Sequence, residues 1–308
     1  MTIEAYADTF VGQRVVWYDP NVGAQEVPGS CVYRIGGLEY GETEWPFADL
    51  LERFLSDPLT QPIIGLVIGA WTYEDILEES STVTTALANA RDRMPHLRAL
   101  FVGDILREEC EISWINHSPM AALLDSYPEL QYFRVRGANG LRFPNLQHAN
   151  LRSLTIESGG LPGDLLQDIF AADLPELEHL ELWLGSENYG AADVNALTTL
   201  LQGGLFPKLR YLGLRNYDQI DALTPMLASA PILERIATLD LSLGNLSDDG
   251  AAHLISAADT LKKLDQVDLH HHFLTNEVIE QIRNSGIQAN VAQQLQADDG
   301  YRYIHASE

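Results

Sequence analysis

Carboxylates and aromatic rings recur in the second half of the chain, inside segments rich in alternating apolar residues. Glu181, Asp240 and Asp268 each stand between two apolar residues, and Trp183 and Tyr211 belong to the same kind of segment. Large aromatic side chains bury much area at little cost in rotamer entropy, so they are typical interface anchors. Two carboxylates about 5 Å apart repel one another by roughly 3 kcal/mol at an effective dielectric constant of about 20, and a cationic partner group relieves that repulsion. The pattern predicts a surface that binds a protein or peptide; the alternatives are a solvated acidic stripe and rings covered by another part of the chain.

Basic residues and histidines occupy related positions in neighbouring segments. The candidates that complete the predicted binding surface are Arg134, Arg136, Arg215 and His270. His270 and His272 would share one face of a continuing strand, but a useful metal site needs a third ligand. The sequence therefore favours surface polar residues or a turn over a metal site for this run of histidines.

Three loops are enlarged and combine acidic with aromatic residues: 69–81, 103–118 and 185–190. The candidate partner-binding residues in them are Trp71, Tyr73, Asp104, Glu109, Glu111, Trp114 and Tyr189. Insertions on one face of a repeat protein often mark its binding face, so we expect these loops to form one rim. Independent solvated loops are the alternative. Because no D-x-D-x-D-G loop is present, we predict no metal site there.

Sequence motifs of enzymes are missing from the chain. The patterns G-x-x-x-x-G-K-[ST], H-E-x-x-H and G-x-S-x-G do not occur, nor does G-x-G-x-x-G between a strand and a helix. Cys110 lies in an acidic stretch, which raises a thiol pKa, the opposite of what a nucleophile needs. We therefore predict that the protein is not an enzyme and carries no cofactor.

Composition excludes several classes of partner. The 308 residues include 19 Lys and Arg against 44 Asp and Glu, a formal net charge of −25, and 46% are hydrophobic. Such a charge repels nucleic-acid phosphates and anionic lipids, so neither nucleic acid nor membrane is a predicted partner. Cys31 and Cys110 have no C-x-x-C spacing, and residues 1–10 lack the features of a signal peptide. These observations favour a folded protein of the cytoplasm.

A repeat supplies the elements that position all of these residues. Eight segments share the frame L-x-x-L-x-L, and their fourth positions are Leu66, Leu100, Phe133, Leu154, Leu180, Leu212, Leu239 and Val267. Each frame predicts a short strand, and apolar periodicity predicts helices at 165–174, 194–204 and 250–261. The predicted fold is an α/β right-handed solenoid of horseshoe shape, with a parallel sheet on the concave face and helices on the convex face. The 21-residue spacing between Phe133 and Leu154 leaves no room for a full helix.

The frame covers only part of the chain, which predicts three regions. Residues 1–58 form an N-terminal capping segment, residues 59–295 form the solenoid of about eight or nine repeats, and residues 296–308 form a tail or a cap strand. The sequence further predicts strands at 14–19 and 31–37, a helix at 47–55 and a weak last repeat at 287–291.

Segment 238–282 resembles the ribonuclease-inhibitor type of leucine-rich repeat, through LDLS, NLSDDGA and the leucine spacing that follows. The whole chain is similar to a bacterial family of stand-alone leucine-rich repeat proteins with no assigned biochemical activity, in phrases such as GDILREECEISWI (103–115) and LEHLELWLG (177–185). This resemblance implies genes for ATP-grasp and radical-SAM enzymes nearby. Such enzymes would modify the chain, as a carrier or substrate, in its C-terminal tail, where the candidate positions are Tyr301, Tyr303, Ser307 and Glu308.

Two functions follow as predictions. The first is a non-catalytic cytoplasmic scaffold that binds a protein or peptide with a basic surface on its concave face and acidic-aromatic rim. The alternative is the carrier or substrate that neighbouring enzymes modify.

Overall fold

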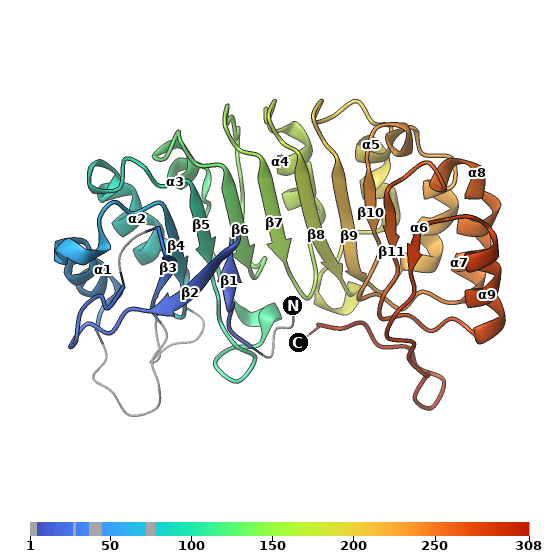
Figure 1. Ribbon diagram of the computed structural model, residues 1–308, viewed down its shortest axis with the longest axis horizontal. Helices are drawn as coiled ribbons and strands as arrows, with labels where there is room; N and C mark the ends of the chain where they lie inside the picture. The colour runs from blue at the N-terminus through green and yellow to red at the C-terminus, as the bar shows by residue number, and fades with distance from the viewer. Residues whose placement is uncertain (1–4, 27–28, 37–44, 72–77, 308) are drawn as a thin grey trace. The chain divides into compact units, whose positions relative to one another are not determined.

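Short strands that alternate with helices follow one another along the chain, as the frame predicts. The computed structural model describes residues 5–26, 29–36, 45–71 and 78–307. These fall into two units: unit 1 holds the described residues up to 156 together with 172–174, and unit 2 holds 157–171 and 175–307. Each unit has an α/β architecture with a mostly parallel, open sheet (Figure 1). The division of the chain into 1–58, 59–295 and 296–308 stays a prediction.

The strands of unit 1 follow the chain in order. They are β1 (Thr9–Phe10), β2 (Gln13–Trp17), β3 (Cys31–Ile35), β4 (Gly65–Ile68), β5 (Ala99–Val102), β6 (Tyr132–Arg136) and β7 (Ser153–Glu157), of which Glu157 belongs to unit 2. β1 and β2 are antiparallel, whereas β2 to β6 pair in parallel. Leu66 pairs with Leu100, and Leu100 with Phe133, so the predicted fourth positions of the frame are in register.

The N-terminal segment extends the parallel sheet, although the frame does not reach it. β2 pairs with β3 in parallel, and Arg34 of β3 lies opposite Val67 of β4. The predicted strands and the predicted helix of this segment are confirmed as β2, β3 and α1 (Phe47–Ser56). Because β3 reads Cys-Val-Tyr-Arg-Ile, it contains no leucine that would place it in the frame.

Unit 2 repeats the same arrangement. Its strands are β8 (His179–Gly185), β9 (Tyr211–Tyr217), β10 (Thr238–Asp240), β11 (Gln266–Asp268) and β12 (Ala289–Asn290), each parallel to the next. The frame leucines Leu180, Leu212 and Leu239 are again register partners. β12 lies within 287–291, where the sequence predicts a weak last repeat.

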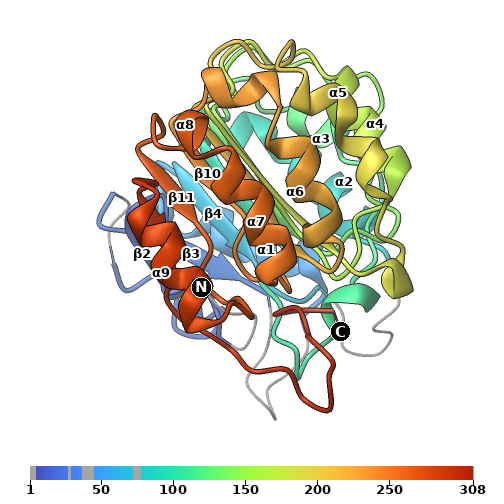
Figure 2. The same ribbon diagram turned by 90° about the vertical axis from the view of Figure 1, so that its right-hand side faces the viewer.

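Helices cover one face of the strands. Unit 1 has α1, α2 (Ser81–Asn89) and α3 (Ala121–Asp125), and unit 2 has α4 (Gly163–Ala171), α5 (Thr198–Leu201), α6 (Ile220–Leu227), α7 (Asp248–Ser256), α8 (Ala258–Leu261) and α9 (Asn276–Asn284). Figure 2 shows α4 to α8 on one side of the strands of unit 2. The three predicted helices are confirmed as α4, as α5 with the preceding 3₁₀ turn, and as α7 with α8; residues 137–152, all described, contain no helix, as predicted.

The frame leucines form the core between sheet and helices. Leu66, Leu100, Leu180, Leu212 and Leu239 have no exposed surface. Burial of one such side chain stabilises the fold by about 1.5–3 kcal/mol. Because side chains alternate along a strand, the residues between these leucines lie on the opposite, helix-free face of each sheet. No helix among the described residues combines the length and apolar character that crossing a bilayer requires.

Candidate functional site

A charged network crosses three strands on the helix-free face of unit 2. Arg215 of β9 donates from Nη1 to Oε1 of Glu181 on β8, at 2.6 Å. Its Nε donates to Oγ of Ser242 at 2.9 Å and lies 3.3 Å from Oδ2 of Asp240 on β10. The side chains of Arg215 and Glu181 are each 12% exposed. We call Glu181, Tyr211, Arg215, Asp240 and Ser242 the Arg215 network.

Gly213 of β9 makes room for this network. Glu181 and Asp240 are both register partners of Gly213. A Cβ atom at Gly213 would lie 3.1 Å from Cε1 of Tyr211 and 3.2 Å from Cγ of Glu181. The missing side chain therefore allows the Tyr211 ring and the Glu181 side chain to lie close to the backbone of β9.

Three rings surround the carboxylates of the network. The Tyr211 hydroxyl donates to Oδ2 of Asp240 at 2.6 Å, and the His179 ring stacks on the Tyr211 ring with centroids 3.9 Å apart. Nε1 of Trp183 donates to Oε1 of Glu181 at 2.8 Å. Each of these groups is fixed by its neighbours, so the network is pre-organised.

Glu181 and Arg215 keep their charges around neutral pH. Burial alone would raise the pKa of Glu181, but the His179 hydrogen bond and the charge of Arg215 hold it well below the usual range. Burial works against the Arg215 cation, but Glu181 and Asp240 raise its pKa. Burial, together with the same two carboxylates, raises the pKa of Tyr211. Charged groups that do not exchange protons suit binding better than acid–base catalysis.

Asp268 continues the acidic row on β11, directly opposite Asp240. Its Oδ1 accepts from the backbone N–H of His270 at 2.9 Å and lies 2.8 Å from Nδ1 of the same residue, and Nδ2 of Asn290 donates to both oxygens at 3.0 and 3.1 Å. Burial opposes ionisation, but the hydrogen bonds from His270 and Asn290 lower the pKa of Asp268. The side chains of Asp268 and His270 are 16% and 23% exposed, more than those of Arg215, Glu181 and Asp240.

Trp183 is not the accessible anchor that the sequence suggests. It is 2% exposed, and the ring of His305 packs against it at a centroid distance of 6.2 Å. The expectation of a free ring is therefore wrong, because a segment from the end of the chain covers it. Tyr211, stacked on His179, is half-buried.

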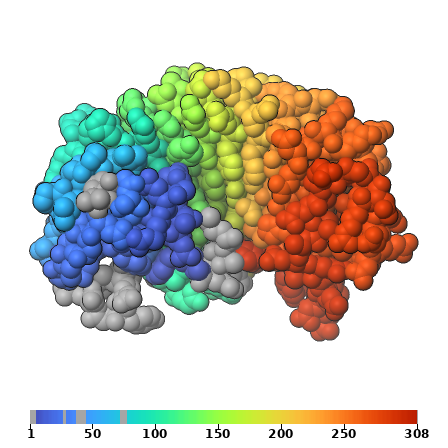
Figure 3. Space-filling model, in the orientation of Figure 1, coloured from blue at the N-terminus to red at the C-terminus, as the bar shows by residue number. Residues whose placement is uncertain are grey.

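The C-terminal segment is bound to unit 2 and is not a detached tail (Figure 3, red). The N–H of His305 donates to the carbonyl of Leu243 at 2.9 Å, and Ala306 is 2% exposed. The rings of Tyr301 and Tyr303 are 67% and 63% exposed. Of the other predicted modification positions, Ser307 is half-buried and Glu308 lies outside the described residues.

Asn216 holds this segment, and sequence reasoning missed it. Its Oδ1 accepts from the N–H of Ala306 at 2.9 Å, and its Nδ2 donates to the carbonyl of Ala306 at 2.5 Å. No sequence motif marks this residue, and its left-handed φ of 53° is a feature of the folded chain.

Arg134 and Arg136, predicted as part of the partner-binding surface, are buried in unit 1. They are 8% and 2% exposed, respectively. Nη1 of Arg136 lies 3.8 Å from Oδ1 of Asp104, and Nε of Arg34 donates to Oδ2 of Asp104 at 3.0 Å. Asp104 also accepts from the backbone N–H of Ala7 at 3.2 Å. The prediction of accessible arginines, and of Asp104 on a rim, is wrong because the N-terminal segment and the loop after β5 fold over these side chains.

Two of the enlarged loops do meet in unit 1. Trp71 and Cys110 pack against the buried side chains of Ala70, Ile105 and Ile115. These two loops are therefore not independent of one another, because they share an apolar cluster. Burial, then Glu111 and Glu109, raises the pKa of Cys110 to about 11, in the direction that the acidic stretch predicts.

The other predicted rim residues are scattered. Trp114 is 51% exposed, whereas Glu109 and Glu111 are half-buried, and Oε2 of Glu109 accepts from the N–H of Leu106 at 2.8 Å. Tyr189 is half-buried in unit 2, and Tyr73 lies outside the described residues.

Buried histidines hold turns together. Nε2 of His272 lies 3.1 Å from the carbonyl of Val291, and its Nδ1 accepts from the N–H of Leu274. His117 makes the equivalent bridge in unit 1, with Nε2 2.8 Å from the carbonyl of Arg136. This agrees with a turn for the histidine run. In the described part of the chain, no three His, Cys, Asp or Glu side chains are grouped to hold a metal.

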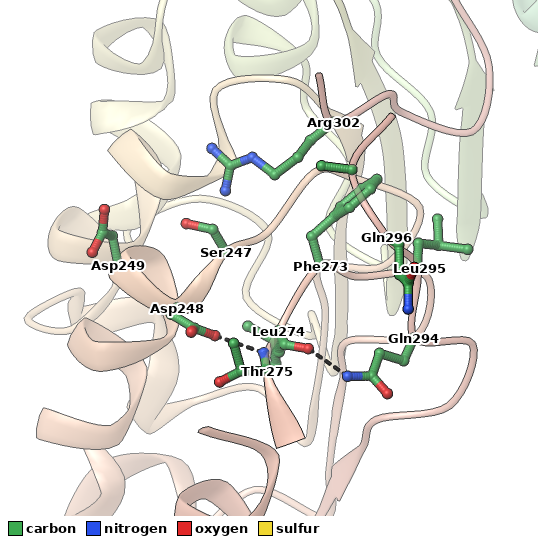
Figure 4. A pocket seen from close by; sticks show the side chains of 11 residues that line it. Ser247, Asp248, Asp249, Phe273, Leu274, Thr275, Gln294, Leu295, Gln296 and Arg302 are labelled. Atoms are coloured by element: carbon green, nitrogen blue, oxygen red, sulfur yellow. Dashed lines mark hydrogen bonds between the residues drawn. The ribbon is translucent and has the colours of Figure 1, made fainter. Parts of the chain in front are cut away.

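A cavity of about 560 Å³ lies between the N-terminus of α7 and the loops at 273–275 and 294–297 (Figure 4). Asp248 accepts from the N–H of Thr275 at 2.8 Å across it, and Gln294 donates to the carbonyl of Leu274 at 2.7 Å. These hydrogen bonds connect the loops that line the cavity within unit 2.

A crystal structure of a protein from Bacteroides fragilis, determined as a structural-genomics target, is similar to this chain. The two are 32% identical with a TM-score of 0.77, and the alignment covers 84% of this chain and 72% of that chain. No protein-family model matches the sequence, and no curated protein does.

Proposed function

This chain belongs to the same family as the Bacteroides fragilis protein, and we propose that it is a non-catalytic cytoplasmic scaffold that binds a protein or peptide. On this proposal the solenoid is of the leucine-rich repeat type and the helix-free face is its concave surface. The frame residues that pair in register within each unit support this reading.

The charge balance on the helix-free face of unit 2 carries the proposal. Glu181 and Asp240 share the guanidinium of Arg215. Asp268 is the next carboxylate in the row, and it accepts hydrogen bonds from His270, Asn290 and Gln266, none of which is an arginine or lysine. Three carboxylates beside one arginine leave negative charge at Asp268, where the side chain is partly exposed. This location favours a lysine or arginine side chain of a partner.

The rigidity of the face supports binding. Glu181, Arg215 and Tyr211 are already held by hydrogen bonds, so a partner does not have to order them. Association is weakened when interface side chains must be immobilised, and a pre-organised surface avoids that cost. An extended peptide that crosses β8 to β11 would meet the ordered carboxylates Glu181, Asp240 and Asp268 in sequence.

Fluorescence anisotropy with a labelled peptide of alternating alanine and lysine tests the proposal. We expect saturable binding to the wild-type protein and binding at least about fivefold weaker to Asp268→Asn, because loss of one interfacial charge costs about 1 kcal/mol or more. The counterpart peptide of alternating alanine and glutamate should not bind.

Asp259→Asn is the matched control, because the Asp259 carboxylate is 97% exposed on α8, away from the helix-free face. It removes the same charge from the chain and should leave the affinity unchanged. Equal weakening by both substitutions would show that only total charge matters and would refute a site at Asp268.

The exposed rings of Tyr301 and Tyr303 favour a second candidate function. On this view the chain is a carrier or substrate whose C-terminal segment is modified by ATP-grasp or radical-SAM enzymes encoded nearby. Intact-mass measurement after co-expression with such enzymes should then show an added mass that Tyr301→Phe/Tyr303→Phe abolishes. An unchanged mass in the wild-type chain would argue against a carrier.

A further inference from the structure

The C-terminal segment is bound by a part of unit 2 that contacts its main-chain atoms. We call this part of unit 2 the seat. Asn216 uses both ends of its carboxamide, accepting from the N–H and donating to the carbonyl of Ala306. One residue earlier, the N–H of His305 donates to the carbonyl of Leu243. Three hydrogen bonds to the backbone of two consecutive residues are the pattern by which proteins hold an extended peptide irrespective of most side chains.

The seat is built into the fold. Asn216 has no exposed surface, and its Nδ2 also lies 3.2 Å from the carbonyl of Ser158, which fixes the orientation of the carboxamide. Asn216 and Leu243 both have left-handed φ angles, 53° and 67°. This conformation is uncommon for residues other than glycine, and here it occurs at both residues that hydrogen-bond to the backbone of His305 and Ala306.

The side chains of the bound segment indicate which sequences fit. Ala306 is 2% exposed, so the seat accepts a small residue there. The ring of His305 packs edge-on against Trp183, and against His271 at a centroid distance of 5.5 Å. Nε2 of His305 is buried without a hydrogen-bond partner, so this position suits a flat apolar ring better than histidine.

We propose that the surface formed by Trp183, Asn216, Leu243 and His271 is a binding site for an extended peptide segment with a small residue preceded by a flat ring. The C-terminal segment of the chain itself occupies the site and must leave before another peptide enters. The site is separate from the carboxylate at Asp268, so this proposal and the proposed function fail independently.

A tethered segment competes strongly with a free peptide. A linked chain end has an effective concentration on the order of millimolar, so a peptide with micromolar intrinsic affinity binds poorly while the segment is seated. Weakening the seated segment should therefore raise the apparent affinity for an added peptide. The site can therefore bind another peptide although the C-terminal segment fills it in this structure.

The test uses a fluorescein-labelled peptide with the sequence of residues 301–308 and the full-length protein. Ala306→Pro removes the N–H that donates to Oδ1 of Asn216. Ala306→Leu places a large side chain where the seat encloses the small side chain of Ala306. Both variants should bind the peptide at least tenfold more tightly than the wild type. Replacing histidine by phenylalanine in the peptide should preserve or strengthen binding, and N-methylation of its alanine should weaken binding at least tenfold.

Tyr303→Ala is the matched control, because Tyr303 belongs to the same segment and its ring is exposed. It should bind the peptide as the wild type does. The proposal is overturned if both Ala306 variants, folded by circular dichroism, bind the peptide no more tightly than Tyr303→Ala. It is also overturned if N-methylation leaves the affinity unchanged, since the seat would then not recognise the backbone.

Discussion

Arg215 decides the character of the helix-free face of unit 2. Its guanidinium contacts two carboxylates from the strands on either side, Glu181 and Asp240. Removing one partner of a buried ion pair leaves an uncompensated charge, which costs far more than the pair itself contributes. The arginine therefore keeps an acidic row stable within the fold.

Arg215→Met should destabilise the protein by about 3–5 kcal/mol, because it leaves Glu181 and Asp240 buried without a countercharge. Urea unfolding followed by circular dichroism measures the loss. Lys262→Met is the control: the ion pair of Lys262 with Asp259 is exposed, so its loss should cost less than about 1 kcal/mol. A similar, small effect of both substitutions would contradict the role given to Arg215.

His117 makes unit 1 sensitive to acid. Burial lowers the pKa of His117 to about 4 from its usual 6.5, although the bond to the Arg136 carbonyl opposes the shift. Above pH 6.5 the histidine is neutral in both the folded and the unfolded chain, and pH has no effect through it. As the pH falls from 6.5 to 4 only the unfolded chain takes up the proton, so stability is lost across that window.

Between pH 7.5 and pH 5 the wild type should therefore lose about 2 kcal/mol more stability than His117→Gln. Urea unfolding measures the loss for each protein. Comparing the two losses cancels any change in the free energy of unfolding that the substitution causes at all pH values. Equal losses would mean that His117 is protonated in the folded state.

At the scale of elements, β9 is the strand on which the site depends. It contributes Tyr211, Gly213 and Arg215 to the helix-free face, and Asn216 to the seat of the C-terminal segment. Gly213 lies between the two carboxylates in the register of the sheet. A small residue at this position, rather than flexibility of the strand, allows the side chains around it to converge.

Gly213→Ala should cost about 1–3 kcal/mol and weaken binding of the lysine peptide, because the new Cβ displaces Tyr211 and Glu181. The backbone φ of Gly213 is not left-handed, so the effect of the substitution comes only from the space that the new Cβ atom takes up. Gly204→Ala is the matched control, since a Cβ there would have no neighbour within 4 Å. Thermal unfolding compares the two, and an undestabilised Gly213→Ala would show that the network tolerates a side chain there.

At the scale of the whole molecule, the net charge of −25 acts together with the local acidic row. Salt shortens the Debye length from about 14 Å at 50 mM to about 4 Å at 500 mM, which weakens long-range attraction of cations. Hydrogen bonds between backbone groups and a buried carboxamide depend little on salt. The two proposed sites should therefore respond differently.

Between 50 and 500 mM NaCl, the affinity of the wild type for the lysine peptide should fall at least tenfold. The affinity of Ala306→Pro for the peptide of residues 301–308 should change less than threefold. Anisotropy titrations at four salt concentrations measure both. A steep salt dependence of the second peptide would indicate that charge, and not Asn216, holds it.

The pattern of apolar residues determined the repeat and its register. Leu180, Leu212 and Leu239 pair as the frame predicts, because each strand must turn the same face to one core. For the same reason the side chains between them, such as Glu181 and Asp240, were correctly placed together on the opposite face. The L-x-x-L-x-L frame does not include β2 and β3, because neither strand contains a leucine.

Accessibility was decided only by the tertiary structure. Trp183, Arg134 and Arg136 occupy the predicted strand positions and are nevertheless buried, and Asn216 gained a role that no local pattern announces. The covering segments come from the two ends of the chain, Ala7 in unit 1 and His305 in unit 2. Strand periodicity is a local property that the sequence carries, whereas contacts between residues about 90 or more positions apart depend on where the chain returns in space.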